Sequence, residues 1–247
     1  MKLKFDRSRH HTSELAKEIT AYLTREPFAV DEEEDTQGDL VYRVRVREHP
    51  PIGLSLTLGD AVHNARSALE HLAWQLVEAG GGTPGRDTGF PIAKSETAFS
   101  EICKKYLKGA SPAAVTAIQS LRPFLGGDDR FWKLHRLDIA DKHHLLLTAG
   151  AAHRSVNVSF GLPGAGEVRL GLLPERTYPL QDGTEIYRVM KAARESAAQG
   201  VGGEPSFSFE VAFGDDAVVS GEPVMPTIGD LVDGVESAVG SLYSLLA

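Results

Sequence analysis

The amino-acid sequence predicts an α+β protein in which a helical bundle carries an antiparallel β-rich insertion. Segments near the start, in the middle and at the end of the chain place apolar residues at helical spacing. From about residue 153, short β-like runs alternate with turns rich in Gly, Pro and Asp. Residues 227–247 return to helical spacing, so helices from both ends should share one bundle. We therefore expect one domain over 1–247, with 1–150 and 225–247 as a bundle with an N-terminal β-hairpin and 151–224 as the insertion.

Composition narrows the functional classes. The chain has 247 residues, 42% of them hydrophobic and 24% charged, which is ordinary for a globular protein. A net charge of −8 disfavours a broad electrostatic surface for nucleic acid and leaves room for a local basic cleft. The single Cys103 excludes an internal disulfide and a multi-cysteine zinc site. The first residues lack a signal-peptide pattern and no apolar run is long enough to span a bilayer, so we expect a cytoplasmic protein with no membrane contact and no cofactor.

The first part of the chain predicts a helix and a hairpin. Residues 7–24 have an approximate helical stripe, and 31–39 are acidic and contain a glycine, as in a hairpin tip. Residues 40–48 alternate cleanly, which predicts a strand with one wet face. We interpret the arginines of that wet face as a solvated charged surface: Arg43, Arg45 and Arg47.

The remaining elements follow from caps and breakers. A long helix is expected from about 55 to 79 and should end at Gly80 in a left-handed cap. Two short helices follow, the first with Ser95 as N-cap and the second stopped by Pro123. Another major helix should run over 129–148, and the last over 227–247. The expected strands lie between them, at 155–160, 167–173, 184–190 and 206–213.

The stretch "GDAVHNARSALEHLAW" (59–74) carries two opposite stripes on the long helix. At about 100° per residue, one stripe is apolar: Leu58, Val62, Ala65, Leu69, Leu72 and Leu76. The other is polar and aromatic: Asp60, Asn64, Ser67, His71 and Trp74. A plain surface helix would carry Lys, Glu and Gln there, so this composition predicts a half-buried cleft.

The 129–148 helix offers a partner for that cleft. Its face with Leu134, Asp138, Asp141 and Leu145 places carboxylates among leucines. A carboxylate is costly there unless it is paired, and the candidates across the bundle are Arg66, His71 and His63. The candidate catalytic residues are thus Arg66, His71, Asn64, His63 and Asp141. The candidate ligand-binding residues are Lys142, His143, Ser67, Glu70 and Trp74.

Two resemblances follow from these residues. "GDAVHNARSALEHL" with the later "DKHHLL" resembles an uncharacterised bacterial family with the pattern GD-x-x-HN-x-RSALDHL and DKHR-x-L. The chain departs from that pattern at Glu70, where Asp is usual, and at His144, where Arg is usual.

More loosely, Arg66 and His71 resemble the R-x4-H motif of HEPN domains, which are helical bundles and often ribonucleases. That resemblance implies metal-independent RNA cleavage or RNA binding, with the arginine steadying phosphate and the histidine moving a proton. The two side chains point about 140° apart on a regular helix, so either the length of the arginine or a second subunit of a homodimer would have to close that gap.

Two other interpretations stay open beside the ribonuclease. Asp60-x-x-His63 and Asp141-x-x-His144 have the helical spacing of bundle metal ligands, with Glu70 as a weak additional candidate. Alternatively, His63, Asn64, Arg66, His71 and Asp141 form a structural network that fixes helix register, in a non-enzymatic protein whose sheet binds a protein partner. The location of Arg66 and His71 relative to a common solvent groove separates these interpretations.

Overall fold

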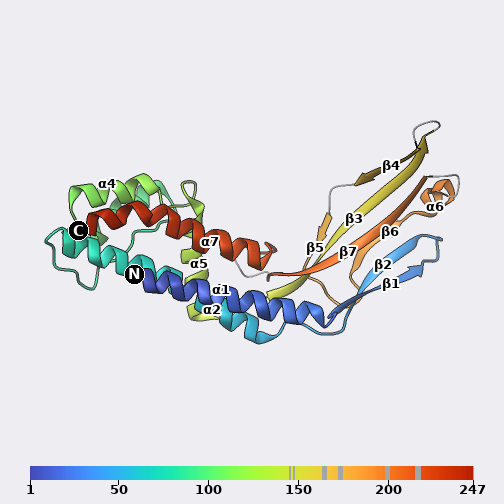
Figure 1. The fold of residues 1–247 in the computed structure, drawn as a ribbon, viewed down its shortest axis with the longest axis horizontal. Coiled ribbons are helices and arrows are strands. Elements are labelled where there is room, and N and C mark those ends of the chain that lie inside the picture. The colour runs from blue at the N-terminus through green and yellow to red at the C-terminus, as the bar shows by residue number, and fades with distance from the viewer. Residues whose placement is uncertain are drawn as a thin grey trace.

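Helices and strands occupy opposite ends of an elongated molecule (Figure 1). This computed structural model describes residues 1–144, 146, 148–162, 166–171, 175–197, 201–214 and 218–246. The predicted α+β class is confirmed, because a helical bundle is combined with antiparallel sheets.

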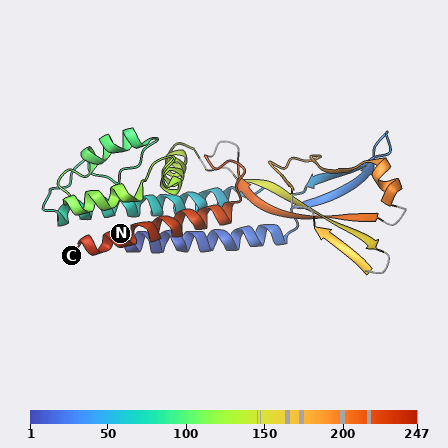
Figure 2. The same cartoon turned by 90° about the horizontal axis from the view of Figure 1, so that it is seen from above.

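Three long helices run side by side and form the body of the bundle (Figure 2): α1 (Lys2–Thr24), α2 (Ile52–Ala79) and α7 (Val224–Val239). A 3-10 helix, η1 (Gly240–Leu246), follows α7, and α5 (Asp129–His143) crosses the long helices. The apolar stripe predicted on α2 is buried throughout: Leu58, Val62, Ala65, Leu69, Leu72 and Leu76. The polar stripe of α2 lies on the other side of the helix, toward the surface, where part of it contacts α5.

Two short helices, α3 (Glu96–Tyr106) and α4 (Pro112–Leu121), cover the end of the bundle away from the strands (Figure 1). Both begin at a serine cap. The Ser95 hydroxyl accepts a hydrogen bond from the Ala98 amide at 3.3 Å, and the Ser111 hydroxyl accepts one from the Ala114 amide at 3.2 Å. The loop 80–95 before α3 returns along α2 and places further side chains beside its polar stripe.

The strands form two antiparallel sheets. The first has the order β1 (Phe28–Glu34), β2 (Leu40–Val46), β6 (Glu185–Val189). In the second, β3 (Thr148–Leu162) pairs with β4 (Gly166–Gly171), β5 (Glu175–Thr177) and β7 (Val201–Phe213). Helix α6 (Lys191–Ala197) lies between β6 and β7 in the chain. The predicted hairpin thus shares a sheet with a strand from the predicted insertion.

Aromatic side chains join the two sheets. The rings of Phe28 and Phe209 lie 5.1 Å apart, and those of Tyr42 and Phe207 lie 5.5 Å apart. On the outer face, arginines of β2 pair with acids of β1: Arg43 with Glu33 at 2.6 Å and Arg45 with Asp31 at 2.5 Å. The arginines are therefore the balanced charged surface that the alternation predicts.

Several element boundaries differ from the sequence prediction. Helix α1 begins at Lys2 because Phe5 and Ser8 are buried, and packing holds its first turns. The acidic residues 31–34 are strand, and the turn lies at 35–39, where the Asp35 carboxylate accepts from the Gln37 and Asp39 amides. Gly81 (φ 80°), not Gly80, has the left-handed conformation after α2.

The predicted 129–148 helix stops early. Helix α5 ends at His143 and His144 is already extended (φ −160°), because Thr148 pairs with Phe213 at the start of β3. None of the helices formed by the described residues combines the length and the apolar character that crossing a bilayer requires.

Candidate functional site

His63 and Asp138 form the core of a polar cluster between α2 and α5. The His63 ring is 49% exposed, whereas the Asp138 side chain is only 3% exposed. Their contact joins His63 Nδ1 to Asp138 Oδ1 at 3.0 Å. A carboxylate accepts only, so Nδ1 carries the proton toward Asp138 and Nε2 of the neutral ring is an acceptor. A buried carboxylate thus orients a histidine whose other nitrogen faces the surface.

Ser67 lies next along the same stripe. Its hydroxyl is 3.4 Å from His63 Nε2, the nitrogen that Asp138 leaves as an acceptor. Ser67, His63 and Asp138 therefore stand in the order hydroxyl, imidazole, carboxylate. The hydroxyl contact is long for a hydrogen bond, which leaves Nε2 available to a closer hydroxyl from a ligand.

Cationic and amide groups border this cluster. Lys142 Nζ, on a half-exposed side chain, donates to Asp138 Oδ2 at 2.6 Å. On the other side, Lys4 of α1 donates to Asn64 Oδ1 at 3.2 Å, and the Asn64 amide donates to the Asp60 carbonyl at 2.8 Å. Two lysines, one from α1 and one from α5, therefore flank the stripe that carries His63.

Asp141 lies one helical turn beyond Asp138, against Gly59 of α2, where a Cβ at position 59 would overlap its carboxylate. Burial raises the pKa of Asp141, and the neighbouring carboxylates Asp138 and Asp60 raise it further. The cluster thus combines a histidine base with a carboxyl group that holds its proton to a higher pH than usual.

Arg66 belongs to a separate, buried network. Its guanidinium pairs with Glu70 at 2.5 Å, lies 3.5 Å from the Phe90 carbonyl and lies 3.4 Å from His135 Nδ1. Burial and the Arg66 charge lower the pKa of His135 to about 4, so this ring is neutral and accepts from Arg66. Arg66 Nη1 is buried without a hydrogen-bond partner among the described residues. The Glu70 carboxylate also accepts from the Phe90 amide at 3.1 Å, so this network ties the loop before α3 to α2.

His71 faces the opposite way, into a hollow of about 410 Å³ that it lines with Glu70, Trp74 and Thr88. The Trp74 indole is 44% exposed, and its Nε1 donates to Glu78 at 3.0 Å. Arg66 lies behind Glu70 and does not line the hollow. The structure therefore does not bring Arg66 and His71 together in one groove.

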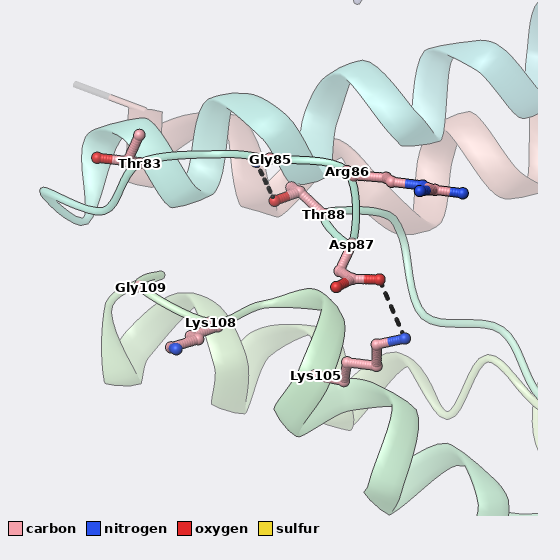
Figure 3. A pocket seen from close by; sticks show the side chains of 8 residues that line it. All are labelled: Thr83, Gly85, Arg86, Asp87, Thr88, Lys105, Lys108 and Gly109. Atoms are coloured by element: carbon pink, nitrogen blue, oxygen red, sulfur yellow. Dashed lines mark hydrogen bonds and ion pairs between the residues drawn. The ribbon is translucent and has the colours of Figure 1, made fainter.

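A second, cationic hollow of about 540 Å³ lies between the loop 83–88 and the end of α3 (Figure 3). Thr88 lines this hollow as well as the one that contains His71. Its charged lining residues are Arg86, Asp87, Lys105 and Lys108. Asp87 points at Lys105 and pairs with it at 3.0 Å, and Thr88 turns back to bond the Gly85 amide. Neither Arg86 nor Lys108 has an ion pair with any residue in the described part of the chain.

The predicted residues thus divide among three places along α2. His63, Ser67, Asn64, Asp141 and Lys142 lie around one cluster, Arg66 is buried behind Glu70, and His71 and Trp74 line the hollow. His143 is exposed in the last turn of α5, and Leu145 lies outside the described residues. The expected pairing of a buried carboxylate with His63 is present, but it is made by Asp138 and not by Asp141.

Three members of these sites were missing from the predicted site residues: Asp138, His135 and Lys4. The sequence pattern could have indicated Asp138, since it shares a helical face with Leu134 and Asp141. No sequence pattern indicates Lys4, because its position depends on how α1 packs on α2.

The proposed metal ligands are not assembled. Helix α5 ends before His144, so Asp141 and His144 do not share a helical face. Among the described residues no three His, Cys, Asp or Glu side chains are grouped so that they would hold a metal ion.

Comparison of this chain with protein-family models, with curated proteins and with solved structures gives no match.

Proposed function

We propose that the chain is a metal-independent RNA-cleaving protein whose general base is His63. The observation that carries this proposal is the 3.0 Å contact between the half-exposed His63 ring and the buried Asp138 carboxylate. Asp138 holds the ring in the tautomer that leaves Nε2 free to take a proton, which is what a general base requires. The proposal keeps the predicted reaction class and moves its centre from Arg66 and His71 to His63.

The reaction is a transesterification within RNA. His63 Nε2 takes the proton of a ribose 2′-hydroxyl, and the 2′-oxygen bonds to the adjacent phosphorus. The bond from phosphorus to the 5′-oxygen breaks, leaving a 2′,3′-cyclic phosphate. Asp141, whose pKa burial raises, is the candidate general acid: its carboxyl gives a proton to the departing 5′-oxygen and leaves a 5′-hydroxyl. Lys4 and Lys142 would balance charge on the phosphate.

The order Ser67, His63, Asp138 favours a second candidate function, acyl transfer with Ser67 as nucleophile. A serine hydrolase also needs donors aimed at the developing oxyanion. The backbone N–H groups beside Ser67 lie inside α2 and are already donated along the helix. Ser67 is therefore the weaker nucleophile candidate, and RNA supplies its own attacking hydroxyl.

The test is cleavage of a single-stranded RNA by the purified protein in the presence of EDTA. His63→Ala should lower the rate by about 10²- to 10⁴-fold, the usual contribution of a general base. His10→Ala is the matched control, because His10 is an exposed histidine on α1, outside the His63 cluster, whose ion pair is with Glu14 at 3.2 Å. Products should carry 2′,3′-cyclic phosphate ends.

Two further variants separate the candidates. Ser67→Ala should retain RNA cleavage, whereas an acyl-transfer enzyme would lose hydrolysis of an aryl ester with the same substitution. Absence of cleavage by the unmodified protein, or full cleavage by a folded His63→Ala variant, would refute the proposed ribonuclease and leave the cluster with a structural role.

A further inference from the structure

We infer that the two hollows beside α2 form one groove that binds a single-stranded RNA segment, with a base against Trp74 and phosphates against Arg86, Lys105 and Lys108. This inference rests on the proposed function and names where its substrate would be held. It concerns residues outside the His63 cluster, so it is tested separately.

The two hollows meet at one residue. Thr88 lines both the hollow of about 410 Å³ with His71 and Trp74 and the hollow of about 540 Å³ with the cationic residues. Each volume lies in the range of small-molecule pockets. The groove therefore has an aromatic compartment and a cationic compartment side by side, which matches the flat base and the charged phosphate of a nucleotide.

The aromatic compartment is suited to an unstacked base. Trp74 is 44% exposed, yet its indole N–H is held by Glu78 at 3.0 Å, so the ring has a fixed position on α2. Glu70, the acid in this compartment, has its charge balanced by Arg66 at 2.5 Å. Bases stack on such exposed aromatic rings when the strand is single, because a duplex keeps its bases stacked on each other.

The cationic compartment has a local excess of positive charge. Three cations and one acid line it, in a protein with a net charge of −8. Asp87 pairs with Lys105 at 3.0 Å, whereas Arg86 and Lys108 have no acidic partner within the described part of the chain. Two uncompensated cations in a hollow attract an anion, and phosphates of a strand are the anions that lie beside a base.

The groove and the His63 cluster lie on one line along α2. Trp74 follows His63 by eleven residues, which places it about 16 Å farther along the helix and about 20° around it. Ser67 and Glu70 lie between them on the same side. A strand bound in the groove can therefore continue along α2 to His63, where its backbone would be cleaved.

The test measures binding without cleavage. The probe is a fluorescein-labelled oligoadenylate of about six nucleotides, within the site size typical of single-strand binding proteins. Fluorescence anisotropy is measured with the His63→Ala variant, or with the unmodified protein and the deoxy oligonucleotide, which lacks the attacking hydroxyl. Trp74→Ala should weaken binding by about tenfold or more, whereas Trp74→Phe should retain most of the affinity because it keeps an aromatic face.

Salt dependence tests the cationic compartment. Arg86→Gln with Lys108→Gln should weaken binding and reduce the slope of log K against log salt by about 1.4, since each phosphate contact contributes about 0.7 for single strands. The control is Lys17→Gln, an exposed lysine on α1 outside the groove, which should leave the slope unchanged.

The outcomes distinguish the groove from the proposed function. If the unmodified protein does not cleave RNA but the groove variants lose binding, the groove stands and the ribonuclease fails. If folded Trp74→Ala and Arg86→Gln/Lys108→Gln variants bind the probe as tightly as their parent, the groove is wrong even when cleavage is present. Equal competition by a polyglutamate peptide would also overturn it and identify an acidic protein segment as the ligand.

Discussion

Removing His63 and Lys142, the two side chains that pair with Asp138 among the described residues, should destabilise the protein by more than the sum of the two single removals. His63 contacts one carboxylate oxygen at 3.0 Å and Lys142 donates to the other at 2.6 Å, while the Asp138 side chain itself is 3% exposed. After either single removal the carboxylate keeps one charge-stabilising partner. After both removals, the carboxylate is a buried charge without either of these two partners.

The magnitudes follow from these environments. We expect His63→Ala to cost about 2 kcal/mol, the range for a hydrogen bond to a charged group. Lys142→Ala should cost about 1 kcal/mol, because its side chain is 54% exposed and solvent screens the pair. Leaving a buried charge unpaired costs about 3–5 kcal/mol, so the double variant should lose about 4–5 kcal/mol. The excess over additivity is then about 1–2 kcal/mol.

Urea unfolding followed by circular dichroism measures these values from the midpoint, provided the slope m is unchanged. The control makes the same two single variants and the double variant in an Asp138→Asn background. No buried carboxylate remains there to lose its partners, so the excess over additivity should disappear. Additivity within about 0.5 kcal/mol in the original background would show that Asp138 does not depend jointly on the two partners.

Two further predictions concern pH and helix packing. The pKa of His135 is about 4 in the folded protein against 6.5 unfolded, so the unfolded chain binds the proton first and stability should fall as pH drops from about 6.5 toward 4. Solvent screening at this partly buried ring brings the loss to about 2 kcal/mol, and unfolding curves of His135→Gln, which cannot titrate, should lack that part of the fall. Gly59→Ala should lower the unfolding free energy by about 2 kcal/mol because its Cβ would overlap the Asp141 carboxylate, whereas Gly229→Ala on α7, with open space around it, should raise it by about 0.5–1 kcal/mol. Equal thermal shifts for the two alanine variants would contradict the close approach of α2 and α5.

The sequence predicted the fold class and the faces of α2 because both follow from local periodicity. Leu58 through Leu76 repeat at helical spacing, and all six stripe residues are buried. The N-cap predicted at Ser95 is local in the same way, and the structure confirms it. The pairing of β2 with β6 was not predictable, since it joins residues far apart in the chain and depends on the whole topology.

The candidate site was predictable in part for a related reason. The polar stripe of α2 is visible in the sequence, but which carboxylate reaches it depends on how α5 crosses α2. Asp138 and Asp141 share a helical face, and only the crossing decides that Asp138 meets His63. The spacing of Arg66 and His71 did not reveal that the two side chains lie apart, since the buried arginine pairs with Glu70 while the histidine faces the surface. The homodimer and the cytoplasmic location stay predictions.

The packing of α7 against α1 and α5 sets an order of events during synthesis. About 200 residues separate the end of α1 at Thr24 from the start of α7 at Val224. At roughly 5–20 residues per second, the ribosome needs about 10–40 s to make them. Throughout that interval the apolar surface of α1 that α7 later covers has no α7 to cover it, and the matching surface of α5 joins it once residues 129–143 are made; chaperones that bind exposed apolar segments would find their target there.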